Sequence, residues 1–134
     1  MGYSEAFTAA GAVIHDSEYF GSYQGEALFD VTYEGKRGIL AIGFGSCGGC
    51  DAFESEFGYG DNERADWQER LAAFGRGYLN GVMYGDEVAK YRADLVEQAE
   101  WDSDAPAQLR WLDERTRCSA CGFHRGYHAE DCDR

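Results

Sequence analysis

Five cysteines and three histidines are the residues of this chain with the clearest capacity for chemistry. The cysteines form two groups, a central Cys47-Gly48-Gly49-Cys50 and a C-terminal set of Cys118, Cys121 and Cys132. Each group contains a Cys-x-x-Cys pair, a spacing that is typical of metal sites and of redox dithiols. The sequence therefore indicates metal or thiol chemistry at two places.

The C-terminal group supplies four ligands within fifteen residues, in the order Cys118-x2-Cys121-x6-His128-x3-Cys132. Zn²⁺ prefers four such sulfur and nitrogen ligands in a tetrahedron. His124 competes with His128, but only two residues separate it from Cys121, which is a short span for closing the tetrahedron. We therefore predict zinc as the cofactor, held in a closed and hence structural site by Cys118, Cys121, His128 and Cys132.

This ligand order resembles that of the zinc knuckle, whose usual spacing is Cys-x2-Cys-x4-His-x4-Cys. Here the inner loop is two residues longer and the last gap is one residue shorter, and the resemblance covers residues 118–132. It implies metal binding. The RNA-binding role of knuckles would use aromatic and basic side chains around the metal, and it remains an alternative through Arg117, Phe123, Arg125 and Tyr127.

The central pair, Cys47 and Cys50, has three interpretations. The pair is placed where a strand is expected to end and a helix to begin, and a thiol just before a helix N-terminus becomes more acidic, which favours a redox dithiol. It could instead share a four-cysteine metal site with Cys118 and Cys121, or form a tight structural turn. A thioredoxin-like fold would need a cis-proline facing the dithiol, and the single proline, Pro106, has a helical context.

The phrase Gly45-Ser46-Cys47-Gly48-Gly49-Cys50-Asp51, which follows Tyr23-Gln24-Gly25, is similar to a GSC-x-GCD motif of small uncharacterised proteins from actinobacteria and their phages. The similarity covers residues 23–54. It implies a compact accessory or host-takeover protein, encoded by a phage or its host, and it carries no defined activity.

The net charge of −13 is distributed unevenly. Residues 1–109 contain twenty acidic and seven basic residues, whereas residues 110–134 contain five of each. This balance argues against a nucleic-acid or lipid-binding surface on the main body and favours a protein partner with a basic surface. Seven acids between residues 51 and 69 are the candidate partner-binding face: Asp51, Glu54, Glu56, Asp61, Glu63, Asp66 and Glu69.

A non-enzymatic interaction or inhibitor module that acts on a host or partner protein fits these features best. A thiol redox protein that uses Cys47 and Cys50 is the enzyme alternative. We expect a cytoplasmic protein, because residues 1–5 lack a basic region followed by an apolar run and no stretch approaches the roughly 20 apolar residues of a membrane span.

Periodicity predicts an α+β fold in which an antiparallel β-hairpin, formed by residues 26–33 and 37–44, packs against four or five helices. The expected helices cover residues 4–19, 51–57 and 67–82, a stretch capped by Asp86, and a last helix that begins around Pro106 and fades by residue 116. The stripe of aromatic residues at helical spacing over residues 67–112 is expected in the core rather than in a cofactor site. We predict an acidic body over residues 1–116 and a zinc-bound tail over residues 117–134.

Overall fold

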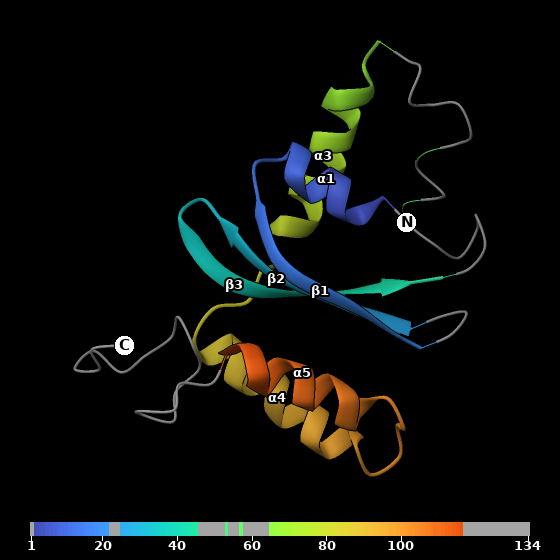
Figure 1. Cartoon of the computed structure of the whole chain (residues 1–134), viewed down its shortest axis with the longest axis vertical. Coiled ribbons are helices and arrows are strands. Elements are labelled where there is room, and N and C mark those ends of the chain that lie inside the picture. Colours follow the sequence, from blue (N-terminus) through green and yellow to red (C-terminus); the bar gives the residue numbers. More distant parts are fainter. Residues whose placement is uncertain (1, 22–24, 46–52, 54–56, 58–64, 117–134) are drawn as a thin grey trace. The chain divides into compact units, whose positions relative to one another are not determined.

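The protein is described here by a computed structural model that covers residues 2–21, 25–45, 53, 57 and 65–116. It has an α+β fold, with a three-stranded antiparallel sheet and, within the described residues, four helices (Figure 1). The contacts of the chain divide it into two compact units, Met1–Val82 and Met83–Arg134. The division falls inside the predicted acidic body. The predicted tail lies outside the described residues, so its boundary stays a prediction.

Helix α1 (Tyr3–Ala9) is terminated by a cap that includes Gly11. The Gly11 N–H donates to the carbonyl oxygen of Thr8 and the Ala12 N–H donates to that of Phe7, both at 3.0 Å. These two bonds form a Schellman motif, which ends a helix at a residue in the left-handed region, and Gly11 has a φ of 99°. The predicted helix over residues 4–19 is therefore wrong beyond this point, because the chain turns and continues as a strand.

The sheet has the strand order β1-β2-β3 and consists of β1 (Val13–Gly21), β2 (Gly25–Tyr33) and β3 (Lys36–Phe44). The predicted hairpin is confirmed as β2 and β3, which pair in register from Tyr33 opposite Lys36 to Gly25 opposite Phe44. Its two-residue turn has φ values of 53° at Glu34 and 81° at Gly35. Positive φ at both positions is the type I′ geometry that matches strand twist.

The additional strand β1 makes β2 the central strand, so that β2 is buried from Ala27 to Val31. Asp30 lies within this buried run and is only 2% exposed. The Arg37 guanidinium donates to both Asp30 carboxylate oxygens, at 2.9 Å from Nε and 2.7 Å from Nη2. These two charge-assisted hydrogen bonds replace those that the carboxylate would make with water, and so offset the cost of burying it.

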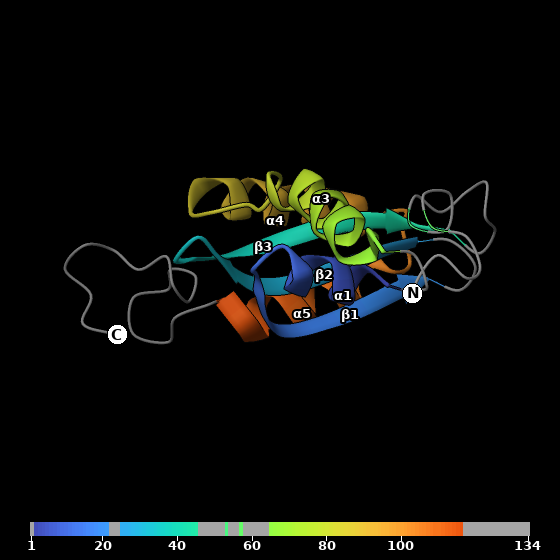
Figure 2. The ribbon, with the colours of Figure 1, turned by 90° about the horizontal axis from the view of Figure 1, so that it is seen from above.

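An aromatic cluster forms the core of the first unit. Helix α3 (Trp67–Leu79) lies beside α1 on one face of the sheet, as Figures 1 and 2 show. The buried Tyr3 ring is central to the cluster, and its centroid lies 5.6 to 6.4 Å from the centroids of four neighbours: Phe7, Phe53, Phe74 and Tyr78. Phe7 in turn meets Phe29 of β2 edge-on at 5.0 Å, which joins α1 to the sheet.

Helices α1 and α3 approach each other closely at Gly75. A Cβ atom at this position would overlap the carbonyl oxygen of Ala6 and would also lie 3.2 Å from the Cβ of Ala10. The glycine at position 75 is therefore required by packing between two backbones rather than by a turn.

The sequence analysis expected α3 over residues 67–82, and the structure places its end at Leu79.

The second unit contains α4 (Asp86–Gln98) and α5 (Ala105–Thr116), which lie side by side (Figure 1). Arg92 of α4 donates to both carboxylate oxygens of Asp113 of α5, at 2.7 and 3.0 Å. This hydrogen bond and the nearby negative charge raise the pKa of Arg92 above its usual value, against the opposing effect of burial. The pair fixes the register of the two helices.

Of the two helix starts that the sequence analysis predicted in this unit, one was wrong. Pro106 is in the first turn of α5, as predicted, but the N-cap of α4 is Gly85 and not Asp86, which is the first helical residue. The aromatic residues also differ from one another. Trp111, which belongs to the predicted aromatic stripe, is 4% exposed, whereas Trp101 is 75% exposed.

None of the helices in the described parts of the chain combines the length and the apolar composition needed to cross a membrane. The predicted helix over residues 51–57 falls mostly outside the described residues, and within it Phe53 is helical.

Candidate functional site

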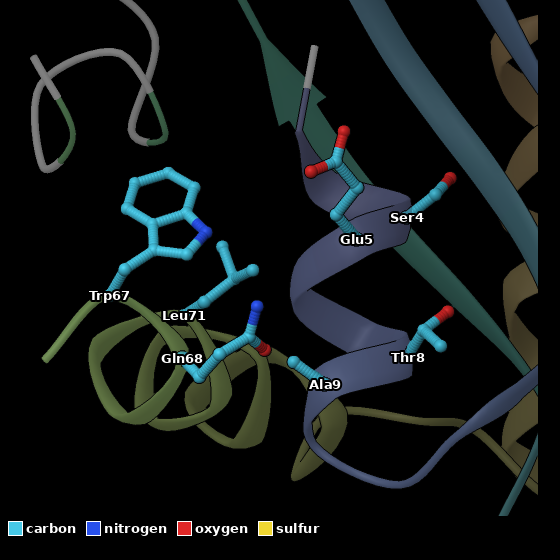
Figure 3. A pocket seen from close by; sticks show the side chains of 7 residues that line it. All are labelled: Ser4, Glu5, Thr8, Ala9, Trp67, Gln68 and Leu71. Carbon is cyan, nitrogen blue, oxygen red and sulfur yellow. The ribbon is translucent and has the colours of Figure 1, made fainter. Parts of the chain in front are cut away.

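A groove of about 400 Å³ lies between α1 and α3 (Figure 3). Among the described residues, seven line it: Ser4, Glu5, Thr8 and Ala9 from α1, and Trp67, Gln68 and Leu71 from α3. We call it the α1–α3 groove. Its volume falls in the range of about 300–1,000 Å³ that is common for ligand pockets in proteins.

Helical spacing explains why these side chains share the groove. On α1 the lining residues are separated by one and four positions, and on α3 the same separations bring together Trp67, Gln68 and Leu71. Residues four apart lie on one side of a helix, so each helix contributes one wall. Because Gly75 allows the two backbones to touch further along, the walls stay close together.

The apolar side of the groove is supported by the core of the first unit. Leu71 is 3% exposed and belongs to a buried cluster with Ala6 and Phe57. The half-buried Trp67 ring meets the Phe57 ring edge-on, with centroids 5.2 Å apart and an interplanar angle of 72°. This contact supports the indole, so that the groove has an aromatic wall packed against the core.

The polar side carries a carboxylate. Glu5 is exposed, and Figure 3 shows its carboxylate across the groove from the Trp67 ring, with Leu71 between them. Among the described residues no hydrogen bond or ion pair involves the Glu5 carboxylate or the Trp67 indole. Gln68 adds an amide group, so the groove combines an aromatic wall with a negative charge and a further hydrogen-bond acceptor.

A second hollow, of about 500 Å³, lies along α3 and is lined by Arg70, Ala73, Phe74, Gly77 and Tyr78. All of these residues come from one helix. The Arg70 guanidinium lies 5.0 Å from the centroid of the Phe57 ring and so already makes a cation–π contact inside the protein.

Two of the seven acids of the predicted partner-binding face fall in the described residues. Asp66 is the half-buried N-cap residue of α3, and Glu69 is exposed in the first turn of that helix. Negative charge at a helix N-terminus is favourable because it opposes the positive end of the helix dipole. Both acids therefore lie where the helix dipole favours negative charge, and their partner-binding role stays a prediction. The other five (Asp51, Glu54, Glu56, Asp61 and Glu63) lie outside the described residues.

The predicted metal ligands also lie outside the described residues. This applies to Cys118, Cys121, His128 and Cys132, to the competing His124, and to the central Cys47 and Cys50. Within the described part of the chain no three His, Cys, Asp or Glu side chains come together as a metal site. The one described histidine, His15, is exposed and makes a 2.7 Å hydrogen bond between its Nε2 and the Thr32 hydroxyl.

The sequence analysis did not identify the α1–α3 groove. Its walls are more than fifty residues apart in the chain, and no local pattern links Glu5 to Trp67. Comparisons of the chain with models of protein families, with curated proteins and with solved structures found no match. The site is therefore argued from its own geometry.

Proposed function

We propose that this protein is a non-enzymatic interaction module that binds a basic surface of a partner protein and carries a zinc ion in its C-terminal tail. The observation that carries the first part is the α1–α3 groove, whose carboxylate has no charge partner among the described residues. The excess of thirteen acidic residues over basic ones in residues 1–109 supports it, because a negative field attracts basic partners.

The zinc proposal is supported by the spacing Cys118-x2-Cys121-x6-His128-x3-Cys132. Four protein ligands would close the coordination sphere and give the metal a structural role. The tail is too short for its own apolar core, and a metal ion supplies the folding free energy that such a segment lacks. The GSC-x-GCD resemblance agrees with an accessory or inhibitor role in a phage or its host.

Partner binding can be tested with a fluorescently labelled peptide of eight alternating lysine and arginine residues. We expect saturable binding by anisotropy at about 20 mM salt and at least a tenfold loss of affinity at about 300 mM, because salt screens interactions between exposed charges. An acidic peptide of equal length should not bind. Equal affinities for the two peptides would refute a basic partner.

Zinc content can be measured by elemental analysis of the protein purified without added metal, together with Cys118→Ser and Cys47→Ser variants. We expect one zinc ion per chain, lost in Cys118→Ser and retained in Cys47→Ser. Loss in both variants would indicate a site shared by the two cysteine groups. Absence of zinc from the parent protein would rule out the tail site.

A further inference from the structure

We propose that the α1–α3 groove is the specific recognition site for one basic side chain of the partner, an arginine or lysine that inserts between Trp67 and Glu5. This inference rests on the proposed function and names the atoms by which a basic partner would be recognised. It differs from a general electrostatic attraction, because it predicts that binding depends on one carboxylate and one indole rather than on net charge.

The aromatic wall fits a cation. A guanidinium or ammonium group within about 6 Å of an indole face is attracted by the ring quadrupole, and tryptophan is the best of the aromatic residues for this contact. The Phe57 ring contacts the Trp67 ring edge-on, which restricts the indole before a ligand arrives. Preorganisation of this kind lowers the entropic cost of binding.

The remaining lining completes the recognition of a long basic side chain. Leu71 and Ala9 offer apolar surface to the methylene stem, which arginine and lysine commonly bury while their charge stays in water. The Glu5 carboxylate accepts hydrogen bonds from the charged head. The Gln68 amide lies on the α3 side of the same groove, whereas Figure 3 shows the Ser4 and Thr8 hydroxyls on the side of α1 away from Trp67.

Charge complementarity decides between a basic occupant and other occupants. Among the described residues that line it, the groove has one carboxylate and no basic side chain. An acidic or phosphorylated partner would place its charge next to Glu5, and a purely apolar partner would bury that carboxylate without a counter-charge, which is costly. A basic side chain satisfies the carboxylate and the aromatic wall together.

In the test of this inference, Trp101 and Trp111 serve as internal controls for Trp67. Each indole N–H gives its own cross-peak in a ¹H–¹⁵N spectrum, and the three rings differ in exposure: Trp111 is 4% exposed, Trp67 is half-buried and Trp101 is 75% exposed. The probe is Nα-acetyl-arginine amide, which carries one guanidinium and no other charge. Nα-acetyl-citrulline amide has nearly the same shape without the charge and serves as the control ligand.

Titration with the arginine probe should shift the Trp67 indole resonance and leave that of Trp111 unchanged, and the citrulline probe should bind more weakly. In Glu5→Gln we expect affinity for the arginine probe to fall by about two- to fivefold, as for other exposed ion pairs. Glu18→Gln, which removes one exposed acid of β1 outside the groove, is the matched control and should retain the affinity of the parent.

The outcomes separate this inference from the proposed function. If the basic octapeptide binds but the Trp67 indole does not move, or if the exposed Trp101 moves instead, the groove is not the recognition site while the basic partner stands. Equal affinities of Glu5→Gln and Glu18→Gln would likewise overturn the role of the carboxylate. If the octapeptide fails to bind, the proposed function itself is refuted.

Discussion

At the residue scale, two glycines of α3 have opposite roles although they are only two positions apart. Gly75 faces α1, where a methyl group would overlap the Ala6 carbonyl oxygen, whereas a Cβ on Gly77 would have no atom within 4 Å. We expect Gly75→Ala to lower the free energy of unfolding by about 1–3 kcal/mol through overpacking. Gly77→Ala should raise it by up to about 1 kcal/mol through better helix propensity.

Urea denaturation of the two variants measures both effects and makes each the control of the other. A Gly75→Ala as stable as the parent would contradict the contact between the α1 and α3 backbones, and a destabilised Gly77→Ala would contradict the open space around Gly77. The circular dichroism of both variants should show that the helices are still formed.

Also at the residue scale, the cost in stability of removing Arg37 is expected to depend on whether Asp30 keeps its charge. Removal of Arg37 leaves a carboxylate that is 3% exposed in its side chain without its bidentate partner, which is strongly destabilising for buried pairs. The Arg37 side chain is 36% exposed, so water can reach the site, and we expect Arg37→Gln to cost about 2 kcal/mol, less than a fully buried pair would.

The companion variant Asp30→Asn removes the charge that needs compensation. In the Asp30→Asn background, the Arg37→Gln substitution should therefore cost clearly less than it does alone, and a double-mutant cycle by urea denaturation gives the coupling energy. The more exposed Arg92–Asp113 pair, at 32% and 27% side-chain exposure, is the comparison, and its disruption should cost less than about 1 kcal/mol. Purely additive effects at Asp30 and Arg37 would contradict this dependence on the charge of Asp30.

At the element scale, the hairpin turn can be improved. Glu34 has a φ of 53°, a conformation that costs energy for most side chains, and Asn-Gly is the preferred pair of a type I′ turn. Glu34→Asn should therefore stabilise the protein by roughly 0.5–1 kcal/mol, while Gly35→Ala, which places a side chain at a φ of 81°, should destabilise it. Thermal unfolding of both variants tests the turn type, and a destabilised Glu34→Asn would argue against it.

Most of the helices and strands could be predicted from the sequence. The hairpin was predictable because alternation and the Glu34-Gly35 turn agree, and α3, α4 and α5 were predictable from helical periodicity. Strand β1 was missed because Phe7, Ala10 and Val13 happen to lie at helical spacing. Gly11 was the available signal, since a glycine after a short helix commonly forms the left-handed cap.

The α1–α3 groove is a harder case for prediction. Glu5 and Trp67 come together only because α1 and α3 pack on one face of the sheet, and that arrangement depends on contacts such as Phe7 with Phe29. Patterns within one helix show which residues share a side but not which other helix they meet. The zinc ligands differ from the groove residues, because their prediction rests only on their spacing along the chain.

At the scale of the whole molecule, the chain positions of the cysteines predict how zinc would affect stability. Cys118 follows the end of α5 by two residues, and Cys47 follows the end of β3 by three. A tail site formed by Cys118, Cys121, His128 and Cys132 would follow directly on α5 along the chain. Metal removal should then lower amide protection in α4 and α5 and leave β2 and β3 unchanged.

Hydrogen exchange with and without a zinc chelator measures this difference, and the amides of the central strand β2 are the internal control. A site shared with Cys47 and Cys50 would also lower protection at the end of β3. The pattern of exchange thus distinguishes the two ligand sets, and unchanged protection in both units would contradict a structural zinc in the tail.

The contact at Gly75 has a consequence for how this protein can change over evolutionary time. The absence of a side chain there lets the α1 and α3 backbones meet beside the groove, so a larger residue would be expected to disturb both the groove and the packing of the core. A lineage could not widen the groove by enlarging this residue without losing stability. Specificity would therefore diversify through the rim, at Glu5, Thr8 and Gln68, where substitutions disturb little else.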